Sequence, residues 1–125
     1  MTARFALLLS AVLMAVAVAL GAFGAHALRS RTSPELLLVW QTAVTYHAWH
    51  ALALLGIGLY LLQRPDATLG AWSAWLFVAG IVLFSGSLYA LVLTGTRALG
   101  AITPIGGAAF IAGWLVFAWA LWRAA

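Results

Sequence analysis

Four long apolar stretches, separated by short polar links, limit this 125-residue chain to a membrane-spanning fold. The first covers about residues 5–27, which as a helix is roughly 34 Å long and can cross a hydrocarbon core of about 30 Å. The other three cover residues 36–62, 69–94 and 102–123. Because 66% of the residues are hydrophobic and only 6% are charged, the chain cannot cover the surface of a soluble domain with polar groups.

The links carry helix start and stop signals. Ser33-Pro34-Glu35 predicts a helix start, since serine caps free amides, proline fits the first helical position and glutamate suits the positive end of the dipole. Pro65 ends the second span and Gly95 ends the third. We therefore expect one all-α domain, an antiparallel up-down bundle of four transmembrane helices. The first apolar stretch is longer than the core of a signal peptide, so we expect it to remain as a span.

The inventory of reactive side chains is small. The chain has no cysteine, which excludes disulfides, thiolate metal sites and thiol nucleophiles. Its two carboxylates, Glu35 and Asp66, fall in or beside links, whereas ion-coupled transport normally uses carboxylates inside the membrane. The six basic residues divide equally between the two ends of the predicted bundle. They form no patch of the size that nucleic-acid binding requires, so no nucleic-acid partner is predicted.

Antiparallel folding predicts that polar residues from all four spans meet in one half of the bundle. The end of the first span, the start of the second, the end of the third and the start of the fourth share one side of the membrane. The predicted polar cluster consists of His26, Tyr46, His47, His50, Ser85, Ser87, Tyr89 and Thr103. Histidine inside a membrane is costly unless it is paired or hydrated, which makes this cluster the candidate site.

Small residues in the same half predict close contact between helices. Small residues at four-residue spacing let helix backbones approach each other in membranes. The predicted packing positions are Ala17, Gly21, Gly24, Ala25, Gly86, Gly106 and Gly107. Gly86 and Ala90 have the same spacing and are equally suited to contact with a second protomer, so a homo-oligomer or a larger membrane complex stays open.

Four motifs, in this order, resemble those of a known small membrane family. They are Gly21-Ala22-Phe23-Gly24-Ala25-His26-Ala27-Leu28, Trp40-x-x-Ala43-x-x-Tyr46-His47-x-x-His50-Ala51-Leu52, Phe84-Ser85-Gly86-Ser87-Leu88-Tyr89 and Ile102-Thr103-Pro104-Ile105-Gly106-Gly107. The family is catalogued as domain-of-unknown-function family 423 and is similar to the eukaryotic transmembrane protein 256. The resemblance implies a four-helix, multi-pass protein of the bacterial inner membrane, and it implies no particular reaction, substrate or ligand.

Three interpretations of the polar cluster are open. In the first, its side chains form hydrogen bonds between helices and hold the bundle together. In the second, histidine and tyrosine bind an amphiphile, such as a lipid or a quinone, through its carbonyl or phosphate group. In the third, His26, His47 and His50 hold a metal ion or haem, although no carboxylate or cysteine lies near them in the sequence.

The sequence favours a non-enzymatic role. Ser85 and Ser87 near a histidine resemble an intramembrane serine protease in residue type only, because nothing in the sequence orients the base. The leading hypothesis is a small integral membrane protein that binds an amphiphile at the polar cluster, with no metal or cofactor predicted. The alternatives are an accessory or assembly subunit of a larger membrane complex, and a haem- or metal-binding protein. Membrane lipids are the partner common to all three.

Overall fold

The computed structural model describes residues 1–124, and every element in that range is a helix. The first span consists of α1 (Ala3–Phe23) and the π-helical turn η1 (Gly24–Leu28), and the second is α2 (Pro34–Gln63). The third consists of α3 (Thr68–Gly80), the π-helical turn η2 (Ile81–Ser85) and α4 (Gly86–Thr94). The fourth consists of the 3-10 turn η3 (Arg97–Ala101) and α5 (Thr103–Ala124). All 4 are long and apolar enough to cross a membrane, which confirms the predicted all-helical, four-span fold.

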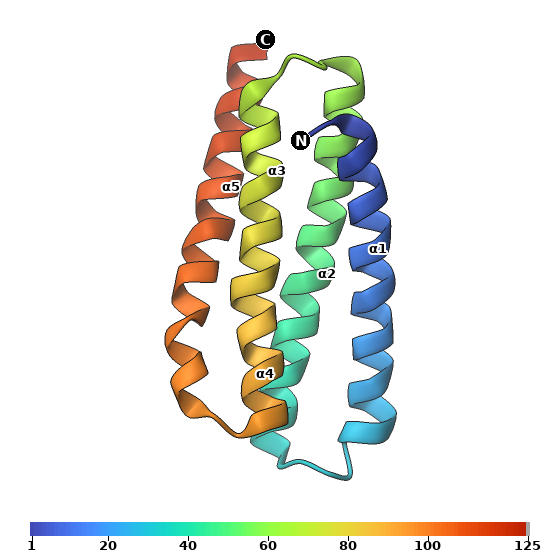
Figure 1. Cartoon of the computed structure of the whole chain (residues 1–125), viewed down its shortest axis with the longest axis vertical. Helices are drawn as coiled ribbons and strands as arrows, with labels where there is room; N and C mark the ends of the chain where they lie inside the picture. The colour runs from blue at the N-terminus through green and yellow to red at the C-terminus, as the bar shows by residue number, and fades with distance from the viewer. Residues whose placement is uncertain (125) are drawn as a thin grey trace.

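The spans lie side by side, and short links join them at alternate ends of the molecule (Figure 1). Helix α1 packs extensively against α2 alone, apart from its own continuation η1. Helix α2 also packs against α3, η2 and α4, while α5 packs against α3 and η2. The second and third spans therefore form the middle of the bundle, and α1 and α5 flank them.

The helix start and stop residues predicted in the links begin and end helices in the structure. The Ser33 hydroxyl accepts a hydrogen bond from the Leu36 amide at 3.2 Å, and Pro34 is the first residue of α2. Gly95 ends α4 in the left-handed conformation, with φ of 71°, which glycine adopts without a steric penalty.

The main apolar core lies where α2 faces α1, the third span and α5. Buried side chains from all four spans form it: Ala6, Leu54, Ile57, Leu61, Ala74, Phe77, Ile81 and Phe110. Lipid tails are as apolar as these side chains, so burial in lipid gives little drive for helix association. Close packing and hydrogen bonds between helices must therefore provide the free energy that holds the four helices together.

All but one of the predicted packing residues are buried or partly buried. Ala17, Gly24 and Gly106 are buried, and Gly21, Gly86 and Gly107 are partly buried. The prediction for Ala25 is wrong, because Ala25 is exposed. It lies in η1, where the i→i+5 hydrogen bonding of a π turn shifts residues round the helix, so a four-residue spacing no longer keeps them on one face.

Gly106 lies against the backbone of the third span. A methyl group added at its Cα would fall against the Phe84 backbone nitrogen and 2.7 Å from the Leu83 carbonyl carbon, both in η2. Backbone atoms cannot turn aside as a side chain can. Glycine is therefore required at this position if α5 is to lie directly on the π turn.

We expect Gly106→Ala to lower the free energy of unfolding by about 1–3 kcal/mol, because the added methyl group forces α5 away from η2. The measurement is SDS-mediated unfolding of the protein in mixed micelles. Gly56→Ala is the matched control, since nothing lies within 4 Å of its added methyl group and alanine favours the helix by about 0.5–1 kcal/mol. Equal unfolding curves for wild type and Gly106→Ala would contradict the assigned contact.

Candidate functional site

His47 and Tyr89 join the second span to the third. The Nδ1 atom of His47 lies 3.0 Å from the Tyr89 hydroxyl, and the His47 side chain is 3% exposed. The Tyr89 ring packs against Trp40, with 4.8 Å between the ring centroids. Trp40 in turn donates its indole N–H to the Leu20 carbonyl oxygen of α1 at 2.9 Å. One chain of contacts thus connects α4 through α2 to α1.

His50 has a partner at both ring nitrogens. Its Nδ1 lies 2.7 Å from the Tyr46 carbonyl oxygen, which can only accept, so Nδ1 carries the proton. The Nε2 atom is then free to accept the indole N–H of Trp114 at 3.2 Å. The ring also stacks on Phe110, with centroids 3.5 Å apart and planes 11° apart. His50 is therefore a neutral ring that ties α2 to α5.

The serines of the polar cluster bind to neighbouring helices. Ser85 donates its hydroxyl to the Ala43 carbonyl oxygen of α2 at 2.7 Å. Ser87 donates to the Phe84 carbonyl oxygen at 2.9 Å, and its oxygen lies 2.7 Å from the Thr103 hydroxyl. Because Ser87 has a single proton, Thr103 is the donor in that second bond. These contacts tie the third span to α2 on one side and to α5 on the other.

Two further serines outside the predicted cluster make bonds of the same kind. Ser10 donates to the Ala51 carbonyl oxygen at 2.9 Å and joins α1 to α2. Ser73 donates to the Gly113 carbonyl oxygen at 2.7 Å and joins α3 to α5. Both are buried. Neither serine is in the cluster predicted from the sequence, although a lone serine in an otherwise apolar span is a signal for such a bond.

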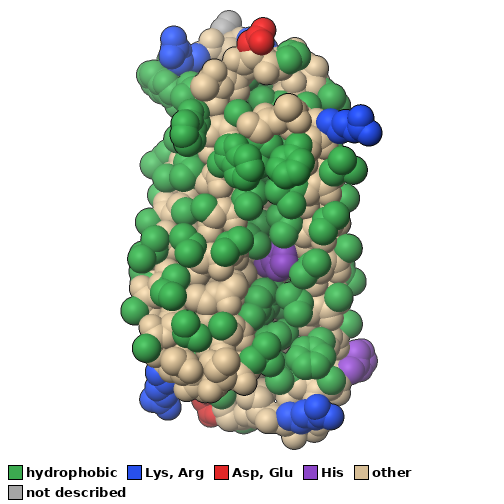
Figure 2. Space-filling view, viewed as in Figure 1, with side chains coloured by type: hydrophobic (Ala, Val, Ile, Leu, Met, Phe, Trp, Pro, Cys, Tyr) green, Lys and Arg blue, Asp and Glu red, His purple; other side chains and the backbone are tan. Residues whose placement is uncertain are grey.

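The structure does not bring His26 to the polar cluster. His26 is exposed on η1, near the link between the first two spans, because the π turn directs it outward. Figure 2 shows one histidine that projects from the lower edge of the molecule and another recessed at mid-height among hydrophobic side chains. Tyr46 contributes its backbone carbonyl group to His50 and its ring to the packing around Phe84, at 4.6 Å between centroids.

The arrangement does not suit a three-histidine metal site. Within residues 1–124, no group of three or more His, Asp or Glu side chains is placed to hold a metal ion. His26 lies on the outer surface, and both nitrogens of His50 already have partners. A metal ion would have to displace Trp114 or the Tyr46 carbonyl group to reach His50.

One buried atom of the cluster has no partner. Among the described residues, Nε2 of His47 is the buried side-chain nitrogen or oxygen that makes no hydrogen bond. The Leu13 backbone carbonyl group of α1 lies close enough to this imidazole to interact with it electrostatically, but outside the distance and angle of a full hydrogen bond. His47 therefore keeps one free hydrogen-bonding position at the boundary between α1 and α4.

A family described as "Protein of unknown function (DUF423)" matches residues 20–107, a segment that contains the whole predicted polar cluster. The chain belongs to this family. No solved structure matches the chain.

Relatives from other bacteria resemble most of the chain. A UPF0382 membrane protein of Staphylococcus aureus is 48% identical over 110 residues, which make up 88% of each chain. The UPF0382 membrane protein YwdK of Bacillus subtilis is 46% identical over 110 residues, 88% of this chain and 89% of YwdK. The UPF0382 inner membrane protein YgdD of Escherichia coli is 45% identical over 115 residues, 91% of this chain and 86% of YgdD. With the four apolar helices, these relatives confirm the predicted family and the multi-pass location in the inner membrane.

The bond between His50 and Trp114 is open to a double-mutant cycle with His50→Phe and Trp114→Phe, which keep an aromatic ring at each position. We expect a coupling energy of about 0.5–1.5 kcal/mol, because either substitution alone leaves one polar partner unpaired. The measurement is the free energy of unfolding in mixed micelles for wild type, the two single variants and the double variant.

Trp122→Phe serves as the control in a second cycle with His50→Phe, because Trp122 is 77% exposed and lies near the end of α5. These two changes should add to within about 0.5 kcal/mol. If the His50 and Trp114 changes were equally additive, the bond between them would contribute nothing to stability.

Proposed function

We propose that this protein binds a membrane amphiphile through a carbonyl oxygen that accepts a hydrogen bond from His47. The main support for this proposal is the Nε2 atom of His47, which is buried and has no hydrogen-bond partner within the described residues. An unpaired buried polar group costs about 1–3 kcal/mol, and a hydrocarbon surrounding offers no water to offset that cost. A ligand that supplies the missing partner recovers this free energy on binding.

The Tyr89 hydroxyl sets the chemistry of the free nitrogen. When Tyr89 donates its proton to Nδ1 of His47, the neutral ring carries its own proton on Nε2 and becomes a donor there. A carbonyl oxygen is the acceptor that membrane amphiphiles commonly present. The Tyr89 hydroxyl in this scheme has a positioning role, since it fixes the form of the His47 ring and makes no hydrogen bond to the ligand.

The packing of α1 supports entry from the lipid side. His47 lies between Leu13 of α1 and Tyr89 of α4, and α1 packs extensively only against α2 and its own continuation. An amphiphile can therefore approach along the boundary between α1 and the third span, directly from the bilayer. Since His47 is only 3% exposed, side chains at this boundary must part when the ligand enters.

The aromatic neighbours favour a flat ligand head. The Tyr89 ring lies 6.0 Å from the His47 ring and packs on Trp40. Flat rings gain from contact with such side chains, whereas a glycerol ester offers no π surface. Among amphiphiles with a carbonyl group, a quinone therefore fits these surroundings better than a lipid ester does.

The test is retention of quinone by protein purified in native membrane discs and analysed by mass spectrometry. We expect wild type to retain a quinone and His47→Phe to retain at least about tenfold less, which corresponds to the loss of one hydrogen bond of about 1.4 kcal/mol. His26→Phe is the matched control, because it makes the same change at an exposed histidine and should retain the wild-type amount.

A titration with decylubiquinone in discs of phosphatidylcholine gives the affinity directly. Tyr89→Phe should weaken binding less than His47→Phe, since it leaves the imidazole in place. Equal quinone retention by the two histidine variants would contradict the proposal. Selective loss of an ester lipid from His47→Phe would instead identify a lipid as the ligand.

A further inference from the structure

A cavity lies at the end of the bundle where the chain termini are found (Figure 1). The end of α2, the start of α3 and the end of α5 surround a cavity of about 530 Å³. Ligand pockets in proteins range over about 300–1,000 Å³, so this cavity is large enough for a small polar group. Small or apolar residues contribute to its walls, among them Ala67, Leu69 and Ala120.

Two guanidinium groups line this cavity from different helices. Arg64 follows the last residue of α2, and Arg123 lies in the last turn of α5. The Nη2 atom of Arg64 donates to the Ala124 carbonyl oxygen at 2.9 Å, which holds the guanidinium across the gap between the two helices. A guanidinium has five N–H donors, so the remaining ones stay available to a ligand.

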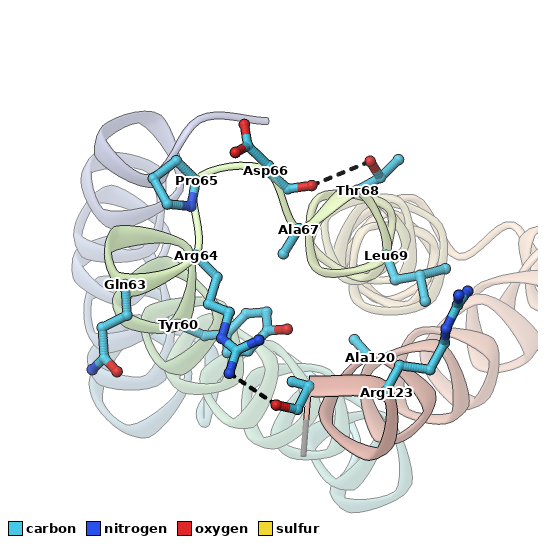
Figure 3. A pocket seen from close by; sticks show the side chains of 11 residues that line it. Tyr60, Gln63, Arg64, Pro65, Asp66, Ala67, Thr68, Leu69, Ala120 and Arg123 are labelled. Carbon is cyan, nitrogen blue, oxygen red and sulfur yellow. Dashed lines mark hydrogen bonds between the residues drawn. The ribbon is translucent and has the colours of Figure 1, made fainter.

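The nearby carboxylate does not neutralise these charges at close range. Asp66 belongs to the same cavity wall, but Figure 3 shows its carboxylate on the outer side of the link, directed away from Arg64 and Arg123. Figure 3 shows the Arg64 guanidinium among the residues that line the cavity and the Arg123 guanidinium beside Leu69, at the margin of the cavity. Among the described residues, no carboxylate lies between Arg64 and the cavity (Figure 3). Arginine binds phosphate groups through paired N–H donors, and such charge-assisted bonds are about twice as strong as neutral ones.

The aromatic residues around the cavity indicate its depth in the membrane, and so the layer of the bilayer from which a ligand would enter. Tyr60 lines its wall, and Trp72, Trp119 and Trp122 are exposed on the turns of α3 and α5 beside it. Tyrosine and tryptophan gather at the boundary between hydrocarbon and headgroups. The cavity consequently opens into the headgroup layer, where phosphate groups of lipids are concentrated.

We propose that this cavity binds a phosphate group, supplied by the headgroup of an anionic lipid, at the Arg64 guanidinium, with Arg123 at the margin of the cavity as a second cation. This site is independent of His47, because His47 lies near the middle of α2 whereas Arg64 directly follows its last residue. The failure of one site would leave the other unaffected.

The experiment reconstitutes the full chain in discs of phosphatidylcholine with a minor fraction of phosphatidylglycerol, and native mass spectrometry counts the lipids retained. We expect wild type to retain phosphatidylglycerol in preference to phosphatidylcholine. The double variant Arg64→Gln and Arg123→Gln should retain at least about tenfold less phosphatidylglycerol than wild type, because both charge-assisted contacts are removed.

The control removes the same charge from the opposite end with Arg31→Gln and Arg97→Gln, which are exposed and lie outside the cavity. This variant should retain phosphatidylglycerol as wild type does. All four positions are exposed, so unfolding curves should show that both double variants fold. Equal retention by the two double variants, or no preference for phosphatidylglycerol in wild type, would overturn the proposal.

A separate arm tests the source of the phosphate. Phosphorus NMR follows inorganic phosphate added to the protein in neutral detergent without lipid. We expect no line broadening, since the lipid tail is needed to hold the headgroup in the cavity. Broadening that disappears in the Arg64→Gln and Arg123→Gln variant, with no lipid preference, would overturn the lipid source and assign the site to a soluble phosphate compound.

Discussion

The absence of water from the hydrocarbon layer is the constraint on which this structure depends. A polar side chain on a span must find its partner within the protein, because lipid tails offer neither donors nor acceptors. Ser10, Ser73 and Ser85 meet this need by donating to carbonyl oxygens of neighbouring helices. Trp40 does the same with Leu20. Each bond satisfies one side chain and at the same time fixes which two helices lie together.

These bonds require helices that approach closely, and small residues and π turns provide the approach. Gly24 leaves room for the Trp40 ring, whose Cδ1 atom would lie 2.6 Å from a methyl group added there. Gly106 lets α5 rest on the backbone of η2, the turn that also places Ser85 opposite Ala43. A π turn displaces the residues after it round the helix axis. The motifs that carry the family resemblance contain both kinds of residue. Some of their residues let two helix backbones approach each other, and others form hydrogen bonds between those helices.

The helical spans could be predicted from the sequence because hydropathy, span length and end signals such as Ser33 and Gly95 are local properties. The partners of the polar side chains could not be predicted with the same detail. Nothing in the sequence marks η1 as a π turn, and that turn removes His26 from the cluster and Ala25 from the helix interface. No feature of the sequence marks Trp114 as a partner either: it is 47% exposed, yet its indole N–H bonds to His50.

The two buried histidines show why residue type alone does not identify a site. His47 and His50 are three residues apart on α2, about 60° round the helix, so they face different neighbours. His50 faces α5, where Trp114 completes its hydrogen bonding. His47 faces α1 and α4, and Tyr89 satisfies one nitrogen only, because helix α1 offers a backbone carbonyl group outside bonding geometry. A residue whose bonding is complete can only hold the bundle together, whereas a residue with one position left can also bind a ligand. The number of free hydrogen-bonding positions, rather than the presence of an imidazole, separates the two roles.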